Sequence, residues 1–196
     1  MNEREIAMPV TIAFELSDSD LEHFMTMARE AHDAMAAQDD AVEKIAAATR
    51  EVFEAAKDTQ LPDFISERLD KLGVLADMVT DSEWRLPEED LERVMCAMAY
   101  FANPEDLIPD RVPGIGFLDD AIMAELVIEN LEAEIVAYQE FCTYRSAEEE
   151  RRTNQGLPTD VSRDDWLADK RAALHSRMRE RRRARSASGG WRVRLW

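Results

Sequence analysis

The stretch NPEDLIPDRVPGIGFLDDA, residues 103–121, decides how this chain folds, because apolar helical segments lie on both sides of it. It holds three prolines, two glycines and five acidic residues, more turn-forming residues than an ordinary linker carries. Asn103 can cap a short helical turn that opens with Pro104, and Pro109 ends this turn. The glycines then allow unusual backbone angles, and the aspartate pair at residues 119–120 can begin the next helix. The stretch therefore predicts a tight reversal between two buried helices.

Apolar residues recur at helical spacing before and after this stretch. Five main helices are predicted, and they begin near Asp18, Val42, Pro62, Pro87 and Leu118. The last of them, expected to run to about Tyr144, is apolar on more than one side, which is typical of a central helix. The first two are joined by a short connection and are expected to form an antiparallel hairpin. The predicted fold class is therefore all-α, a compact bundle of about five helices.

The composition divides the chain into four segments. They are a short extended N-terminal segment over residues 1–17, a helical domain over 18–144, a linker over 145–161, and a basic C-terminal helix and tail over 162–196. The first segment shows weak strand-like alternation, whereas the linker is polar and contains Gly156 and Pro158. We therefore expect one domain of ordinary size followed by a basic helical arm.

The charge is unevenly distributed along a chain that otherwise has the composition of a globular protein. Hydrophobic residues make up 45% of the 196 residues, charged residues 34%, and the formal net charge is -18. From Arg163 onward, however, eleven basic residues stand against four acidic ones, so this part carries +7 and the first 162 residues carry -25. Such an acidic body disfavours nucleic-acid binding, which needs clustered Lys and Arg.

The protein is expected in the cytoplasm. Its first residues lack the charged start, apolar run and cleavage site of a signal peptide. The longest uncharged apolar run, Val94 to Ala102, is about half of the roughly 20 residues that a bilayer span needs, so no transmembrane span is predicted. Cys96 and Cys142 fall within apolar helical patterns, which fits two free thiols of the core in a reducing compartment.

One part of the chain resembles the YkvA-like domain family, a bacterial domain of unknown function. The residues that carry the resemblance are Tyr100-Phe101, Pro104, DLIPD at 106–110, Pro113, Gly116 and LDD at 118–120. The resemblance covers about residues 92–131 and implies a small helical domain without agreed catalytic residues. Many relatives continue with strongly hydrophobic helices and are suspected of membrane association. Glu125, Glu129, Glu132 and Glu134 depart from that pattern here, which argues against membrane insertion.

Four carboxylates near the reversal are the candidate metal ligands, namely Asp106, Asp110, Asp119 and Asp120. Brought together, they could hold Mg²⁺ or Ca²⁺, which prefer oxygen ligands. In the alternative interpretation they cap helix starts and accept backbone N–H groups of the turn. A third interpretation is a catalytic carboxylate pair, but no separately placed nucleophile or base supports it. No other cofactor is predicted, because the three histidines are scattered and the sequence has no glycine-rich phosphate loop.

The basic C-terminal arm is the candidate partner-binding region. Its candidate residues are Arg177, Arg179, Arg181, Arg182, Arg183, Arg185, Trp191, Arg192, Arg194 and Trp196. Guanidinium groups bind phosphates, and Trp rings stack on bases or lie at membrane interfaces, so RNA, DNA and an anionic membrane surface are candidate partners. Self-association or a protein partner is preferred, because the arm can also dock on the acidic body of its own chain or of a second copy. A solvated tail is the remaining alternative.

Two functions are consistent with these patterns. The preferred one is a non-enzymatic binding or regulatory protein that acts through the basic arm and the acidic helical body. The alternative is a divalent-metal-dependent enzyme, a hydrolase, built on the four aspartates. Trp84, which lies between two predicted helices, is either a binding anchor or a residue that seals the edge of the core, and the second role is favoured.

Overall fold

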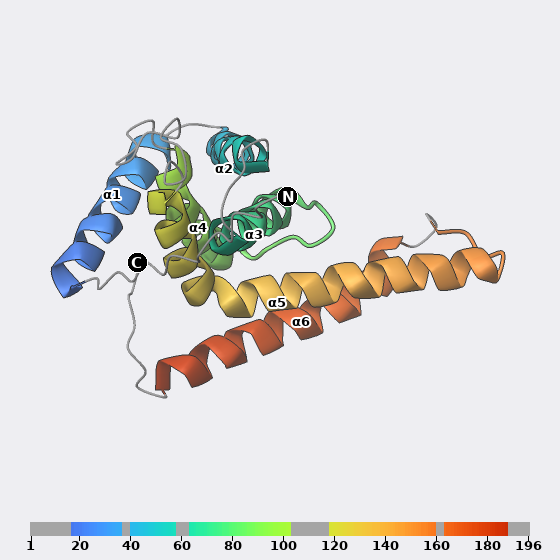
Figure 1. The fold of residues 1–196 in the computed structure, drawn as a ribbon. Helices are drawn as coiled ribbons and strands as arrows, with labels where there is room; N and C mark the ends of the chain where they lie inside the picture. The colour runs from blue at the N-terminus through green and yellow to red at the C-terminus, as the bar shows by residue number, and fades with distance from the viewer. Residues whose placement is uncertain (1–16, 37–39, 58–62, 103–117, 160–162, 188–196) are drawn as a thin grey trace, which may run out of the picture.

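The computed structural model describes residues 17–36, 40–57, 63–102, 118–159 and 163–187 (Figure 1). Its elements are α1 (Asp18–Ala36), α2 (Ala41–Lys57), α3 (Asp63–Thr80), α4 (Glu88–Met98), the 3-10 turn η1 (Ala99–Ala102), α5 (Leu118–Asn154) and α6 (Arg163–Ala187). The described residues form no strand, so the prediction of an all-α fold is confirmed. The predicted extended segment lies outside the described residues except for Ser17, and so does most of the predicted reversal, residues 103–117.

Helix α5 joins the parts of the bundle, because it contacts α3, α4 and α6. Helices α2 and α3 pair with each other, α3 and α4 contact α5, and α1 lies against α4 and η1 (Figure 1). The prediction of a hairpin between α1 and α2 is therefore wrong, because each of these helices finds its main apolar partner elsewhere. Helix α6 runs antiparallel along α5, which places the basic C-terminal helix beside the acidic body (Figure 1).

One hydrophobic core joins α2 through α6. Leu72 of α3, Met98 of α4 and Leu131 of α5 are fully buried in it. Leu174 and Met178 of α6 are also fully buried, although the apolar side of this helix is thin in the sequence. Burying a side chain of this kind contributes about 1.5–3 kcal/mol to stability. Helix α6 is therefore part of the same core as the rest of the bundle.

Helix α5 extends ten residues beyond its predicted end at Tyr144, so the first part of the predicted linker is helical. This extension is polar, but its ion pairs have the spacing that stabilises a solvent-exposed helix. Glu148 accepts hydrogen bonds from Arg151 at 2.6 Å and from Arg152 at 2.9 Å. These arginines, Arg151 foremost, lower the pKa of Glu148 to about 2. A hydrophobic pattern cannot reveal a helical extension whose side-chain contacts are ion pairs.

Gly156 ends α5 in the left-handed conformation, with φ of +67°. The Leu157 N–H donates to the carbonyl of Arg152 at 2.9 Å and the Gly156 N–H to that of Thr153 at 3.1 Å, the pattern of a Schellman cap. A Cβ at this position would meet no atom within 4 Å, so only the backbone conformation resists a larger residue.

Gly156→Ala is therefore expected to destabilise the end of α5 by about 1 kcal/mol. Because this end lies beyond the core, amide hydrogen exchange should accelerate over residues 150–154 while global unfolding changes little. Ser146→Ala, an exposed change in the same extension, serves as the control. Equal exchange rates in the Gly156→Ala variant and the unaltered protein would show that the cap is not needed.

Candidate functional site

The four predicted metal ligands fall mostly outside the described residues. Asp106 and Asp110 lie in the stretch that is not described, and so does the side chain of Asp119. Asp120, in the first turn of α5, is buried. Among the residues that the structure describes, no group of three or more His, Cys, Asp or Glu side chains could hold a metal ion. A Mg²⁺ or Ca²⁺ site at the reversal stays a prediction.

The predicted arginines of α6 form ion pairs with acidic residues of the helical body. Arg177 and Arg181 pair with Glu140 at 3.3 and 3.0 Å, Arg185 pairs with Glu132, and Arg179 and Arg182 pair with Asp90 at 3.6 and 2.5 Å. Arg183 is exposed and forms no ion pair with a described residue. Trp191, Arg192, Arg194 and Trp196 lie outside the described residues. The helical part of the basic arm is thus docked on its own chain.

One of these acids, Asp90, belongs with Glu134 to a buried cluster of charges between α4, α5 and α6. Asp90 is 1% exposed and Glu134 is 0% exposed. One Arg182 nitrogen lies 2.5 Å from Asp90 and 3.2 Å from Glu134, and Arg93 lies 3.3 Å from Glu134. Burial opposes the charge of Arg182, but the hydrogen bond and the charge of Asp90 outweigh it and raise the pKa of Arg182. Each carboxylate of the cluster therefore has at least one guanidinium group beside it.

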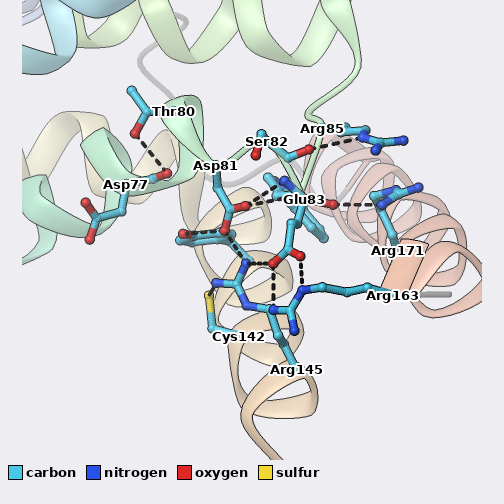
Figure 2. Close-up of polar contacts among 12 residues, drawn as sticks. Asp77, Thr80, Asp81, Ser82, Glu83, Arg85, Cys142, Arg145, Arg163 and Arg171 are labelled. Carbon is cyan, nitrogen blue, oxygen red and sulfur yellow. Dashed lines mark hydrogen bonds and ion pairs between the residues drawn. The ribbon is translucent and has the colours of Figure 1, made fainter. Parts of the chain in front are cut away.

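A second set of polar contacts, which we call the clasp, surrounds the turn between α3 and α4 (Figure 2). Asp81 accepts the backbone N–H groups of Glu83 at 2.8 Å and Trp84 at 3.1 Å. Its second oxygen accepts hydrogen bonds from the Tyr138 hydroxyl at 3.1 Å and from Arg145 at 2.8 Å. Partial burial alone would raise the pKa of Asp81, but these donors outweigh it and lower the pKa. One carboxylate thus shapes the turn and ties it to α5.

Glu83 extends the clasp to α6. It accepts hydrogen bonds from Arg145 at 2.9 Å and from Arg163 at 3.0 Å, and its backbone carbonyl accepts one from Arg171 at 2.8 Å (Figure 2). The bond from Arg163 is the main cause that lowers the pKa of Glu83. The clasp, defined as Asp81, Glu83, Arg145, Arg163 and Arg171, therefore holds α3, α5 and α6 together at one point.

Trp84 fills the core directly behind the clasp. Its side chain is fully buried, and its ring centre lies 5.1 Å from that of Phe141 and 4.3 Å from that of His175 in an edge-on contact. The interpretation that Trp84 seals the core is confirmed. Burial, reinforced by the charge of Arg179, lowers the pKa of His175 to about 4, so this histidine is neutral near pH 7.

His175 makes stability depend on pH in a definite direction. Below pH 6.5 the unfolded chain gains a proton on this imidazole, whereas the folded protein does not until about pH 4. Stability is therefore expected to fall over this window by up to about 1.4 kcal/mol per pH unit. Asp81 and Glu83, whose pKa values are lowered, lose their contribution only below about pH 5.

His175→Phe keeps an aromatic ring beside Trp84 and is expected to remove this dependence between pH 6.5 and pH 5. Urea unfolding of both proteins at several pH values measures it, because the contributions of the carboxylates cancel in the comparison. Parallel stability curves for the two proteins would show that His175 is not held neutral by the fold.

A groove with an apolar floor runs along the seam between α5 and α6. One hollow of about 390 Å³ is lined by Glu132, Ala133, Val136, Arg181, Ala184 and Arg185. A second of about 440 Å³ includes Val136, Gln139, Glu140, Thr143, Tyr144 and Lys170 in its lining. Val136 lines both hollows, and we refer to the two together as the α5–α6 groove.

Sequence reasoning found the arginines of α6 but not the acids that receive them. One signal was present for Glu134: it falls outside the helical stripe formed by Glu125, Glu129 and Glu132 and lies on an apolar side of the helix. Asp90 gave no such signal, because an acid in the first turn of a helix is common. The groove could not be predicted, because its shape depends on the distance between α5 and α6, which cannot be read from the sequence.

None of the described helices is both long and apolar enough to cross a membrane, as the sequence predicted. No curated protein and no solved structure matches the chain significantly. A comparison with family models supports the resemblance to the YkvA-like family. Residues 93–126, from the end of α4 to the first part of α5, match the family described as "Protein of unknown function (DUF1232)", a bacterial domain.

Proposed function

We propose that this protein is a non-enzymatic binding protein and that the α5–α6 groove is its binding surface. The observation that carries the proposal is the shape and chemistry of this groove. Ala133, Val136 and Ala184 form a floor of small apolar side chains. Arg185 and Glu132 pair across it at one level, and Arg181 and Glu140 at another. A groove of this kind suits an amphipathic helix, which lays its apolar face on the floor and its polar edges along the rims.

The pairing of the α6 arginines favours a protein partner over a nucleic acid. A phosphate that bound Arg181 or Arg185 would have to displace Glu140 or Glu132 from it. The acidic body around the groove would also repel a polyanion. We place the protein in the cytoplasm, because Cys96 and Cys142 are both free thiols, which suits a reducing compartment.

Affinity capture with the full chain as bait tests the proposal. Two variants are compared, each of which replaces an exposed alanine of α6 with glutamate. Ala184→Glu puts a carboxylate on the groove floor and should abolish the capture of partners. Ala172→Glu makes the same chemical change at an exposed position of α6 that lines neither hollow, and it should leave capture unchanged. Equal capture by both variants and by the unaltered chain would refute the groove as the binding surface.

Point substitutions are preferable to deletion of the basic arm. A chain that ends before Arg177 lacks Met178, which is buried in the core, and Arg182, which compensates Asp90 and Glu134. Loss of binding in such a chain would report unfolding as readily as the loss of a binding surface.

A further inference from the structure

We infer that a second copy of this chain occupies the α5–α6 groove, in a dimer whose two-fold axis runs parallel to α5 and α6. This inference rests on the proposed function, because it names the partner of the same groove. It follows from the charge along the two walls of the groove, the antiparallel pairing of α5 and α6, which we call the α5–α6 hairpin, and the size of the floor side chains.

The two walls of the groove carry opposite charge. The α5 wall presents Glu132 and Glu140, and the α6 wall presents Lys170, Arg181 and Arg185. These charges already pair across the seam within one chain, so a partner adds most when it sets a basic edge beside the acids of α5 and an acidic edge beside the arginines of α6. The same hairpin, turned over, offers both edges at the required separation.

The direction of the two-fold axis decides which walls meet. An axis parallel to the helices turns the hairpin over without shifting it along its length, so α5 of one copy faces α6 of the other. Glu140 then lies level with the second copy's Arg181, because these two residues already lie level within one chain, 3.0 Å apart. An axis perpendicular to the helices would set α5 against α5 and bring the acidic walls together. Charge complementarity therefore selects the parallel axis.

The floor of the groove allows the close approach that such a dimer needs. Ala133, Val136 and Ala184 are small, so a helix of the second copy can approach the seam closely. In the parallel-axis arrangement each α5 is also antiparallel to the facing α6, as neighbouring helices are in an up-down four-helix bundle. The interface further lies at the basic helix of an otherwise acidic molecule, where repulsion between two copies is smallest.

Sedimentation velocity of the full-length protein over a wide concentration range tests the inference. The unaltered chain and the Ala172→Glu control are expected to dimerise with equal affinity. Val136→Glu and Ala184→Glu are expected to raise the dimer dissociation constant by about tenfold or more, because each buries a carboxylate at the interface. Neither replaces a residue of an ion pair, and circular dichroism confirms that each variant stays helical.

Charge reversal tests the direction of the axis. Arg181→Glu with Arg185→Glu makes both walls acidic, and Glu132→Arg with Glu140→Arg makes both walls basic. A chain with all four substitutions exchanges the charges of the two walls. With a parallel axis, this chain is expected to dimerise with itself but not with the unaltered chain, because like-charged walls then face each other. A heterodimer between this chain and the unaltered chain would overturn the parallel axis, because only a perpendicular axis sets their oppositely charged walls together.

The outcomes also separate this inference from the proposed function. A monomeric unaltered chain at every concentration, or an Ala184→Glu variant that dimerises normally, overturns the second copy as the occupant. If the chain is monomeric and Ala184→Glu still loses capture of a different protein, the groove remains a binding surface. If Ala184→Glu changes neither dimerisation nor capture, both proposals fail.

Discussion

Replacing Arg182 with alanine is expected to lower the free energy of unfolding by about 3–5 kcal/mol, the cost of leaving buried charges without their partner. Asp90 and Glu134 are almost completely buried, and Arg182 lies within 2.5 and 3.2 Å of them. Arg93 retains its contact with Glu134 at 3.3 Å, whereas Asp90 keeps only the longer contact with Arg179 at 3.6 Å, so the loss is expected to be more severe at Asp90. Equilibrium unfolding in urea, followed by circular dichroism, measures the change.

Arg183→Ala is the matched control for this experiment, since it removes the same side chain from the next position on α6. Arg183 is exposed, and the change should alter stability by less than about 0.5 kcal/mol. In a background that carries Asp90→Asn and Glu134→Gln, Arg182→Ala should cost much less, because no buried charge remains to be compensated. Equal costs in the two backgrounds would show that Arg182 stabilises α6 by packing alone.

Trp84→Ala is expected to destabilise the protein by a comparable amount, about 3–5 kcal/mol, through the cavity that it leaves. The ring is fully buried and lies against Tyr138, Phe141 and His175, so it joins the turn after α3 to both α5 and α6. The clasp residues cannot fill this space, because hydrogen bonds hold their side chains in place.

Trp166→Ala provides the comparison for Trp84. Trp166 belongs to α6 and is only partly buried, beside Tyr144 and the guanidinium groups of Arg152 and Arg163. Its loss should cost clearly less, because solvent already reaches part of the ring. If thermal melting shows that Trp166→Ala is the more harmful change, Trp84 is not the centre of packing between the turn and the last two helices.

The positions where helices begin could be predicted from the sequence, because the signals are local. Asp18 was predicted to begin the first helix and does so, and Pro87 precedes α4 with three acids in its first turn. The all-α class could also be predicted, because apolar residues recur with the 3.6-residue period of a helix. The identity of most core residues follows as well, since a period also tells which face of a helix is apolar.

What the sequence could not provide are features that depend on distant partners. The partners of the buried acids are separated along the chain by 92 residues for Asp90 and Arg182, and by 48 for Glu134 and Arg182. Periodic patterns in a single sequence are local, so they do not reveal pairs of residues this far apart. The α5 extension was missed for a different reason: it is a helix without an apolar stripe, and hydrophobic periodicity is blind to it.

The pairing of α1 and α2 shows the limit of reasoning from loop length. A short connection makes a hairpin the default expectation, but the apolar face of α2 packs on α3 and that of α1 reaches α4 and η1. A helix could pack on several apolar faces, and the packing of the complete core decides which one it contacts. That choice is a property of the assembled bundle and is not contained in any one stretch of sequence.

Helix α6 contacts residues that lie far from it in the sequence, so the protein can complete its fold only late in synthesis. Glu83 can accept its hydrogen bond from Arg171 only after another 88 residues have been synthesised, and Asp90 can pair with Arg182 only after 92. A nascent chain that has emerged only as far as α5 still lacks the helix that compensates Asp90 and the imidazole that packs on Trp84. Resistance of ribosome-bound chains to protease should therefore appear late and abruptly, once α6 has left the exit tunnel.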